Sequence, residues 1–436
     1  MPDPIPHIPV AVVGAGQAGL SISYHLKARG IEHLVFEKHR ALHVWRERRW
    51  DSFCLVTPNW QCDLPGYPYR GGDPHGFMVK DEILEYLSGF ASAVDAPLRE
   101  GVAVERVSPR PEGGFDVQTS AGAYRAAAVV AASGGYHEPI VPRVAERLPK
   151  SIVQLHSEQY RNPQSLPEGA VLVVGAGQSG AQIAEDLHLA GRRVLLAVGG
   201  APRCARFYRG RDVVAWLADM GYYDMPVERH PLREGVRDNT NHYVTGRGGG
   251  RDIDLRKFAL EGMELYGALK DFDGERLHFE RNLRVCLDDA DRTYNGINGG
   301  IDKYIAEAGI DAPPPSVYAP VWTPEVERGS LALERSGVSA ILWCIGFRPD
   351  FRWLDAPTFN GAGQPKHARG VSDCDGVYFL GLPWLHTWGS GRFSGVGRDA
   401  LHLADRIEQR LRATSRVSRA ASRWLTGRSA HRRQQE

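Results

Sequence analysis

The clearest pattern along the chain is a short apolar run that ends in a glycine-rich turn. The run 10–13 is followed by the glycines of a GxGxxG motif, which are Gly14, Gly16 and Gly19. A helical pattern of apolar residues then predicts a helix over 20–29, and a second strand is predicted over 32–37. A strand, glycine turn, helix and strand in this order are typical of the first unit of a dinucleotide-binding fold.

The same pattern returns in the middle of the chain. The apolar run 171–174 leads into a second GxGxxG motif, with the glycines Gly175, Gly177 and Gly180. A helix over 181–190 and a strand over 193–198 are predicted after it. In both copies another glycine, Gly30 or Gly191, follows the last motif glycine by 11 residues and would end the helix. One GxGxxG motif is weak evidence, but two copies in matching contexts predict two nucleotide sites.

The remaining pattern predicts an α/β protein with two Rossmann-type dinucleotide-binding domains, the second inserted into the first. Other elements are expected as helices over 80–93, 254–269 and 397–411 and as strands over 102–107, 115–119, 127–132 and 340–345. We expect the first domain to comprise residues 1–149 and 331–410, and the second to comprise 150–330. The second domain would carry an inserted substrate or lid segment over about 203–330, and a basic tail would cover 411–436.

Composition excludes several classes of function. The 53 Lys and Arg residues against 52 Asp and Glu give a net charge of +1, so no bulk charge attracts nucleic acid or an anionic membrane. No apolar run approaches the roughly 18 residues of a membrane span, and the N-terminal MPDPIPHIP does not resemble a signal peptide. No two of the six cysteines are spaced CxxC, which argues against a zinc site and a redox dithiol. We expect a cytoplasmic protein without a metal, nucleic-acid or membrane partner.

The two copies differ where their second strand ends. Glu37 lies 18 residues past the first motif, where a carboxylate accepts hydrogen bonds from free ribose hydroxyls; this suits FAD or NAD. The same offset in the second copy reaches Val198, and Arg203 and Arg206 follow. Because guanidiniums bind phosphate dianions well, we predict that these arginines hold the 2′-phosphate of NADPH. Two such sites in one chain indicate hydride transfer from a pyridine nucleotide to a flavin.

Further segments resemble the class B flavin-dependent monooxygenases, a family that includes flavin-containing, indole-pyruvate and Baeyer–Villiger monooxygenases. Val44-Trp45-Arg46 and Leu55-Val56-Thr57-Pro58 are similar to the family's GxWR…LxTP segment beside the isoalloxazine ring. Ala132-Ser133-Gly134 and Cys344-Ile345-Gly346 look like its two A-T-G turns. Gly381 and the segment 394–400 resemble its last FAD segment, so the resemblance spans roughly residues 8–410.

The resemblance implies a set of cofactor and catalytic residues. The implied FAD contacts are Gly14, Gly16, Gln17, Ala18, Gly19, Glu37, Lys38, Trp45, Arg46, Trp50, Thr57, Val104, Gly134, Gly381, Gly395 and Val396. The implied NADPH contacts are Gly175, Gly177, Gln178, Ser179 and Gly180, together with Arg203 and Arg206. Asn59 and Arg46 are the candidate catalytic residues, as donors to developing negative charge at the flavin. A turn-forming Pro-Asn is the alternative for Asn59.

The family fingerprint FxGxxxH is half present. His156 and a following aromatic residue, Tyr160, match it, whereas Lys150 and Ile152 stand where Phe and Gly are expected. A hinge histidine without a chemical role is the alternative for His156. The incomplete fingerprint favours oxygenation of sulfur, nitrogen or a 2-oxo acid over ring expansion of a ketone.

The activity that the resemblance implies needs NADPH, FAD and O2. NADPH would reduce FAD, O2 would form a flavin C4a-hydroperoxide, and a small-molecule substrate would accept one oxygen atom. Arg392 and His386, in a glycine- and aromatic-rich loop before the last predicted helix, are placed to shape the substrate site. An NADPH oxidase or reductase without oxygen insertion and a flavin-binding redox sensor stay open as alternatives, as does a homodimer.

Overall fold

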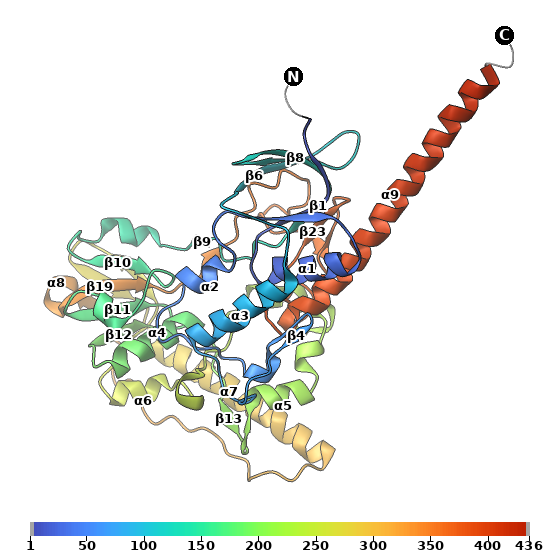
Figure 1. The fold of residues 1–436 in the computed structure, drawn as a ribbon. Helices are drawn as coiled ribbons and strands as arrows, with labels where there is room; N and C mark the ends of the chain where they lie inside the picture. Colours follow the sequence, from blue (N-terminus) through green and yellow to red (C-terminus); the bar gives the residue numbers. More distant parts are fainter. Residues whose placement is uncertain (1–3, 433–436) are drawn as a thin grey trace.

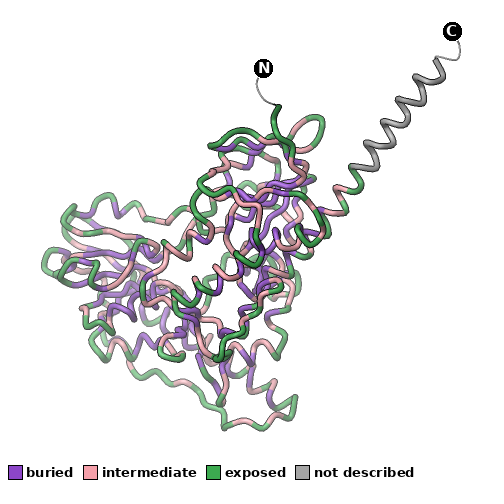
Figure 2. Tube along the Cα trace, in the orientation of Figure 1, coloured by how far each residue is buried: buried purple, intermediate pink, exposed green. Residues whose placement is uncertain are grey.

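The fold consists of two parallel-stranded units, seen in a computed structural model that describes the backbone of residues 4–432 and the side chains of 4–414 (Figure 1). The chain passes from the first unit to the second and returns to the first. Short paired strands, β9 (Glu138–Pro139) and β20 (Phe347–Arg348), join the outgoing and returning segments. Buried residues concentrate along the strands of both units (Figure 2).

The first unit is built around the first glycine motif. Its parallel strands run in the order β23 (Val377–Phe379), β8 (Gly122–Ala131), β1 (His7–Val13), β2 (His33–Glu37) and β5 (Leu98–Glu100). Antiparallel strands extend it: β6 (Val104–Pro109), β7 (Phe115–Thr119), β21 (His367–Ala368) and β22 (Val371–Ser372). Helix α1 (Gln17–Ala28) packs against α3 (Lys80–Val94) and α9 (Val396–Arg432). The central strands are apolar because they form part of the core.

The second unit repeats this plan around the second motif. Its strands are all parallel, in the order β10 (Val153–His156), β19 (Val338–Trp343), β11 (Ala170–Val174), β12 (Val194–Ala197) and β15 (Glu264–Tyr266). Helix α4 (Gln178–Leu189) connects β11 to β12 as α1 connects β1 to β2. All five strands lie between β8 and β23 in the sequence, so the prediction of one Rossmann-type domain inserted into another is confirmed.

The segment between β12 and β19 differs from the prediction in its helices. The helix expected over 254–269 is wrong: α6 (Leu255–Leu260) is short, and Gly262, with φ +104°, turns the chain into β15. A helix that was not predicted, α7 (Leu283–Ala308), is the longest in this segment. It packs with α5 (Val213–Asp219) around a separate apolar cluster that includes Trp216 and Ile301. A hairpin-like sheet of β16 (Leu269–Phe272), β17 (Arg276–Phe279) and β18 (Ser330–Ala332) completes the segment.

The predicted basic tail over 411–436 begins within α9, whose backbone continues to Arg432. Residues 433–436 and the side chains beyond residue 414 lie outside the described part of the chain.

Candidate functional site

The first glycine turn is shaped by packing at two of its glycines and is open at the third. A Cβ atom on Gly14 would lie 2.7 Å from the carbonyl oxygen of Ala132, and one on Gly19 would lie 1.8 Å from that of Gly14. A Cβ atom on Gly16 would meet nothing within 4 Å. Gly16 also begins α1, which has neither a side-chain cap nor an acidic residue in its first turn. The free amide groups of this helix end therefore suit an anion such as a pyrophosphate.

Glu37 lies beside this turn, as its predicted role requires. One carboxylate oxygen accepts from the backbone N–H of Ala15 at 3.0 Å, and the other accepts from that of His39 at 3.0 Å. The carboxylate thus stands next to the helix end where the ribose of a dinucleotide would lie. The neighbouring Lys38 is exposed.

Val104 does not join the other predicted FAD residues. It pairs with Thr119 in the antiparallel extension of the sheet and packs against the apolar cluster there. The nearby residue that does contact this region is Val102, whose backbone N–H donates to the carbonyl of Glu37 at 3.0 Å. Val102, rather than Val104, therefore lies beside Glu37.

Predicted residues from three distant segments meet at the start of α1. The indole N–H of Trp45 donates to the side-chain oxygen of Gln17 at 3.1 Å, and the Gln17 amide donates to the carbonyl of Gly391 at 3.4 Å. The rings of Trp45 and Phe393 lie 5.3 Å apart. These contacts join α1, the short helix α2 (His43–Glu47) and the loop that precedes α9.

Glycines allow the loop that precedes α9 to approach the start of α1 closely. At Gly381, with φ +82°, a Cβ atom would lie 2.7 Å from that of Ala18. Gly395 packs on the backbone of Gly389, where a Cβ atom would come within 2.4 Å, and Val396 is fully buried at the start of α9. Gly134, with φ +83°, follows β8 and has open space where a Cβ atom would stand. The open glycines and the carboxylate of Glu37 fit FAD.

The second glycine turn has the same construction. A Cβ atom on Gly175 would lie 2.6 Å from the carbonyl oxygen of Cys344, and one on Gly180 would lie 1.9 Å from that of Gly175. Gly177 faces only a methyl group, that of Thr240, at 3.3 Å. Helix α4 begins with Gln178 and Ser179, and it too has no side-chain cap and no acidic residue in its first turn. This turn therefore fits a second dinucleotide.

Arg203 has a structural environment, which corrects the expectation that it binds a 2′-phosphate. Its side chain is 3% exposed and forms ion pairs with Asp291 at 2.9 Å and Asp254 at 3.6 Å. Its guanidinium also lies 4.0 Å from the ring centre of Tyr318 and 4.5 Å from that of Tyr294. Burial acts to lower the pKa of Arg203, but the two carboxylates raise it above its usual value. The protein's own acids already neutralise this charge.

Arg206 is likewise engaged by the protein itself. Its side chain is 1% exposed, pairs with Asp212 and donates to the carbonyl of Val56 at 2.6 Å. The guanidinium also stacks on the ring of Phe77, at 4.7 Å from its centre. Neither arginine is free for a phosphate. What remains of the sequence argument for NADPH is Val198, which places no carboxylate at the end of β12.

Asn59 holds a loop, in agreement with the alternative reading as a turn residue. The side chain is 4% exposed; its amide donates to the carbonyl of Asp73 at 2.9 Å, and its oxygen accepts from the N–H of Met78 at 2.8 Å. Thr57 lies two residues earlier in the same loop and is half-buried. The environment of Asn59 is that of a structural residue rather than of the predicted catalytic donor.

Arg46 and Trp50 also point away from the position predicted for them. Arg46 donates to the carbonyl of Ala41 at 3.3 Å and to the hydroxyl of Ser88 on α3 at 3.2 Å. It lines a surface hollow of about 290 Å³ beside α3. Trp50 is buried in the apolar core of the second unit, with its ring 4.9 Å from that of Phe53. Arg46 therefore joins two helices, and Trp50 joins the two units.

The fingerprint residues lie at the junction of the units. The His156 ring donates to the carbonyl of Gly346 at 3.1 Å, and burial lowers its pKa, which favours the neutral form. Tyr160 donates to Asp186 at 2.7 Å. The same carboxylate accepts from Ser52 of the first unit at 2.7 Å and from Arg247 at 2.7 Å. These contacts agree with the hinge alternative for His156 and assign the fingerprint a role in domain contact.

Arg49, which was not among the predicted residues, lies over Trp45, whereas Arg46 contacts Ser88. Its guanidinium carbon lies 4.9 Å from the ring centre of Trp45 and 5.4 Å from that of Phe53. Arg392 stacks on Trp388 at 3.6 Å and donates to the side-chain oxygen of Asn241 at 2.8 Å. Arg49 lies two residues past the end of α2, so the pattern of this helix does not single it out among its neighbouring arginines.

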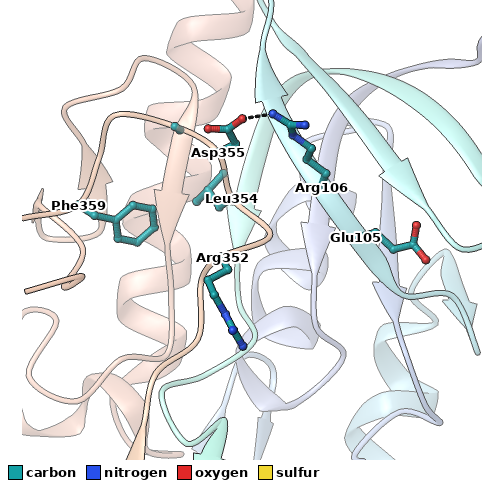
Figure 3. Close-up of a pocket in the computed structure, with 7 residues that line it drawn as sticks. Glu105, Arg106, Arg352, Leu354, Asp355 and Phe359 are labelled. Carbon is teal, nitrogen blue, oxygen red and sulfur yellow. Dashed lines mark hydrogen bonds and ion pairs between the residues drawn. The ribbon is translucent and has the colours of Figure 1, made fainter.

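A second hollow on the surface lies apart from the predicted cofactor residues. A hollow of about 550 Å³ lies between β6 and the segment 352–359, where Arg106 pairs with Asp355 (Figure 3). It contains none of the predicted cofactor residues. Among the described residues, no cluster of His, Cys, Asp or Glu could hold a metal ion. None of the helices described is long and apolar enough to cross a membrane.

Comparisons with known proteins extend over most of the chain. Residues 11–218 match the family described as pyridine nucleotide-disulphide oxidoreductase. A protein of Geobacillus kaustophilus named "Uncharacterized oxidoreductase CzcO-like" is 32% identical over 406 residues, covering 92% of this chain and 98% of the relative. Indole-3-pyruvate monooxygenase YUCCA4 of Oryza sativa subsp. japonica is 30% identical over 203 residues, covering 42% of this chain and 46% of that protein.

The fold has a counterpart among solved structures. A flavin-containing monooxygenase from Stenotrophomonas maltophilia superimposes with a TM-score of 0.63 at 20% identity, covering 93% of this chain and 99% of that chain. The two glycine turns of this chain fit FAD and NADPH, the cofactors expected from the sequence. The chain is an oxidoreductase of the CzcO-like family.

Proposed function

We propose that this protein is an FAD-dependent, NADPH-consuming monooxygenase that transfers one oxygen atom of O2 to a small organic substrate. The observation that carries the proposal is the pair of open glycine turns, of which only the first has a carboxylate at the end of its second strand. When bound, FAD accepts a hydride from NADPH and, once reduced, activates O2. The reacting atom of the substrate is sulfur, nitrogen or part of a 2-oxo acid, as the incomplete fingerprint favours.

The chain's own residues bind the cofactors and exclude water. The free amides at the start of α1 and the carboxylate of Glu37 would hold the pyrophosphate and the ribose of FAD. The start of α4 would hold the pyrophosphate of NADPH. The aromatic rings of Trp45, Phe53 and Phe393 pack on one another beside Gln17, which limits the access of water to that side.

A second candidate function is an NADPH oxidase that releases the oxygen as hydrogen peroxide. The environments of Asn59 and Arg46 favour it, because both predicted donors are engaged elsewhere in the fold. Oxygen transfer needs donors that are positioned before the reaction and shielded from water. The two candidates therefore differ in where the oxygen goes rather than in the reduction of the flavin.

The coupling of NADPH use to product separates the two candidates. The FAD-loaded enzyme is supplied with NADPH, O2 and one candidate substrate at a time: a thioether, an amine or a 2-oxo acid. A monooxygenase forms about one oxygenated product per NADPH with at least one of them and releases little peroxide. Recovery of all consumed O2 as hydrogen peroxide with every candidate would instead establish the oxidase.

A further inference from the structure

The two glycine turns differ in what lies over them. At the first turn, a Cβ atom on Gly16 would meet nothing within 4 Å. At the second turn, the corresponding atom on Gly177 would lie 3.3 Å from the methyl carbon of Thr240, which belongs to the segment between β12 and β19. The second glycine of such a motif lets the backbone approach the pyrophosphate of a dinucleotide closely. The methyl group of Thr240 therefore stands where the pyrophosphate of NADPH would lie.

Residues 240–245, which we call the strap, are anchored at their C-terminal end. Two hydrogen bonds join Val244 to Gln178, the first residue of α4. The Gln178 amide donates to the Val244 carbonyl at 2.7 Å, and the Val244 N–H donates to the Gln178 side-chain oxygen at 3.3 Å. The residue after the strap, Gly246, packs so closely on the first unit that a Cβ atom would lie 2.1 Å from the carbonyl oxygen of Leu55. Contacts with both units therefore hold this end in place.

The other end of the strap lies at the surface. Thr240 and Asn241 are both exposed. The side-chain oxygen of Asn241 accepts from the guanidinium of Arg392 at 2.8 Å. Arg392 lies in the loop before α9 and follows Gly391, whose carbonyl accepts from the Gln17 side chain at 3.4 Å. The hydrogen bond of Asn241 therefore ties the strap, which lies over the second turn, to the loop that contacts the first turn.

We propose that Thr240 and Asn241 form a gate over the second glycine turn, which is closed in the absence of NADPH and opens when the nucleotide binds. Opening moves Thr240 away from Gly177 about the anchored end of the strap and breaks the hydrogen bond between Asn241 and Arg392. The inference rests on the proposed use of NADPH and adds how access to its site is controlled. Because the closed state must open first, the gate reduces the apparent affinity for the nucleotide and slows its association.

The hydrogen bond of the gate can be removed without changing either glycine turn. In N241A the closed state loses a hydrogen bond from a charged donor, so we expect NADP⁺ to bind the oxidised, FAD-loaded enzyme roughly three- to tenfold more tightly than in the wild type, and to associate faster. Calorimetry gives the affinity, stopped-flow recording of the flavin fluorescence gives the association rate, and neither needs turnover. N239A is the matched control: Asn239 is exposed and precedes the gate, so this variant should bind NADP⁺ as the wild type does.

Two further comparisons separate the gate from a general change in charge or fold. In an R392M background the hydrogen bond is already lost, so N241A should then change NADP⁺ binding by less than a factor of about two. T240S removes the methyl group and T240V keeps one there, so T240S should bind NADP⁺ roughly threefold more tightly than T240V. Thermal unfolding and FAD content show that each variant is folded.

The outcomes distinguish the gate from the function on which it rests. An unchanged NADP⁺ affinity and association rate in N241A would overturn the gate, and so would an equal effect of N241A in the R392M background. Enzyme that binds no NADP⁺ in any of these forms would overturn both the gate and the proposed use of NADPH. If the variants behave as expected but the enzyme forms no oxygenated product, the gate stands and the monooxygenase function is refuted.

Discussion

At the scale of single residues, the partner of a buried charge decides its role. Arg203 and Arg206 follow the second nucleotide strand in the sequence, which is why they were predicted to bind phosphate. In the structure, Arg203 pairs with Asp291, which lies far from it in the chain, and Arg206 pairs with Asp212, which lies beyond a turn. No local sequence pattern reveals such partners. The sequence likewise could not show that Arg49 lies over Trp45 while Arg46 contacts Ser88 of α3, because Arg49 follows the end of α2 and its position depends on packing.

Replacing Arg203 should therefore destabilise the fold rather than weaken NADPH binding specifically. R203A leaves the buried Asp254 without its cation and leaves Asp291 with Arg256 as its remaining partner, and removing one partner of a buried ion pair typically costs about 3–5 kcal/mol. Denaturant unfolding measures this loss. R292A, which removes an exposed partner of the exposed Asp289, is the control and should cost much less. Full stability of R203A combined with a large loss of NADPH affinity would restore the phosphate-binding role.

His367 should make the protein less stable in acid. Burial lowers its pKa from 6.5 in the unfolded chain to about 4 in the folded protein. The unfolded state thus takes up the proton first, and the free energy of unfolding falls as the pH drops from about 6.5 to about 4. H367Q removes this titration, so the stability of the variant should depend less on pH in that range. If the free energy of unfolding depends on pH in the same way in H367Q and in the wild type, His367 is not the group that titrates.

At the scale of elements, the two strand–turn–helix units were predictable because their signals are local. The GxGxxG spacing, the apolar strands and the glycine that ends each helix all lie within about 30 residues. Helix α7 was missed, since Gly296, Gly299 and Gly300 interrupt a pattern whose apolar positions still recur at helical spacing. The helix expected over 254–269 was overextended, because the apolar residues of β15 continue the pattern past the turn at Gly262.

The first glycine turn provides a matched pair of variants. G16A adds a methyl group in open space at a backbone conformation that alanine accepts, so the protein should fold with nearly unchanged stability and lose FAD. G19A places the methyl group 1.8 Å from the carbonyl oxygen of Gly14, so it should destabilise the fold itself. Thermal unfolding of the FAD-free forms and the bound FAD content check this. Full FAD content in G16A would contradict the binding role of this turn.

At the scale of the whole molecule, the candidate site is assembled from contacts that the sequence does not encode locally. Asn241 of the inserted segment meets Arg392 of the loop before α9, and Trp45 meets Phe393 across a large separation in the chain. Trp45 and Gly381 both contact α1, at Gln17 and Ala18, and their role in binding FAD stays a prediction. The predicted domain boundaries and a homodimer stay predictions.

Asp186 should couple the two units. It accepts hydrogen bonds from Ser52, Tyr160 and Arg247, which come from three different segments. We expect D186A to lower the free energy of unfolding by about 1–3 kcal/mol for the donors left unpaired. We also expect it to slow the reduction of FAD at saturating NADPH, because the units would hold the two nucleotides less firmly in register. S52A, which removes one contact, should have a smaller effect; an unchanged rate in D186A would show that this contact does not set the register.

The central claim is that one chain brings NADPH to a flavin. Mixing the FAD-loaded enzyme with one equivalent of NADPH in the absence of O2, while recording the flavin absorbance, tests it most directly. The account predicts that the oxidised flavin band disappears within the time of a catalytic turnover and returns when O2 is admitted. A flavin that stays oxidised with NADPH, although a chemical reductant bleaches it, would contradict the account.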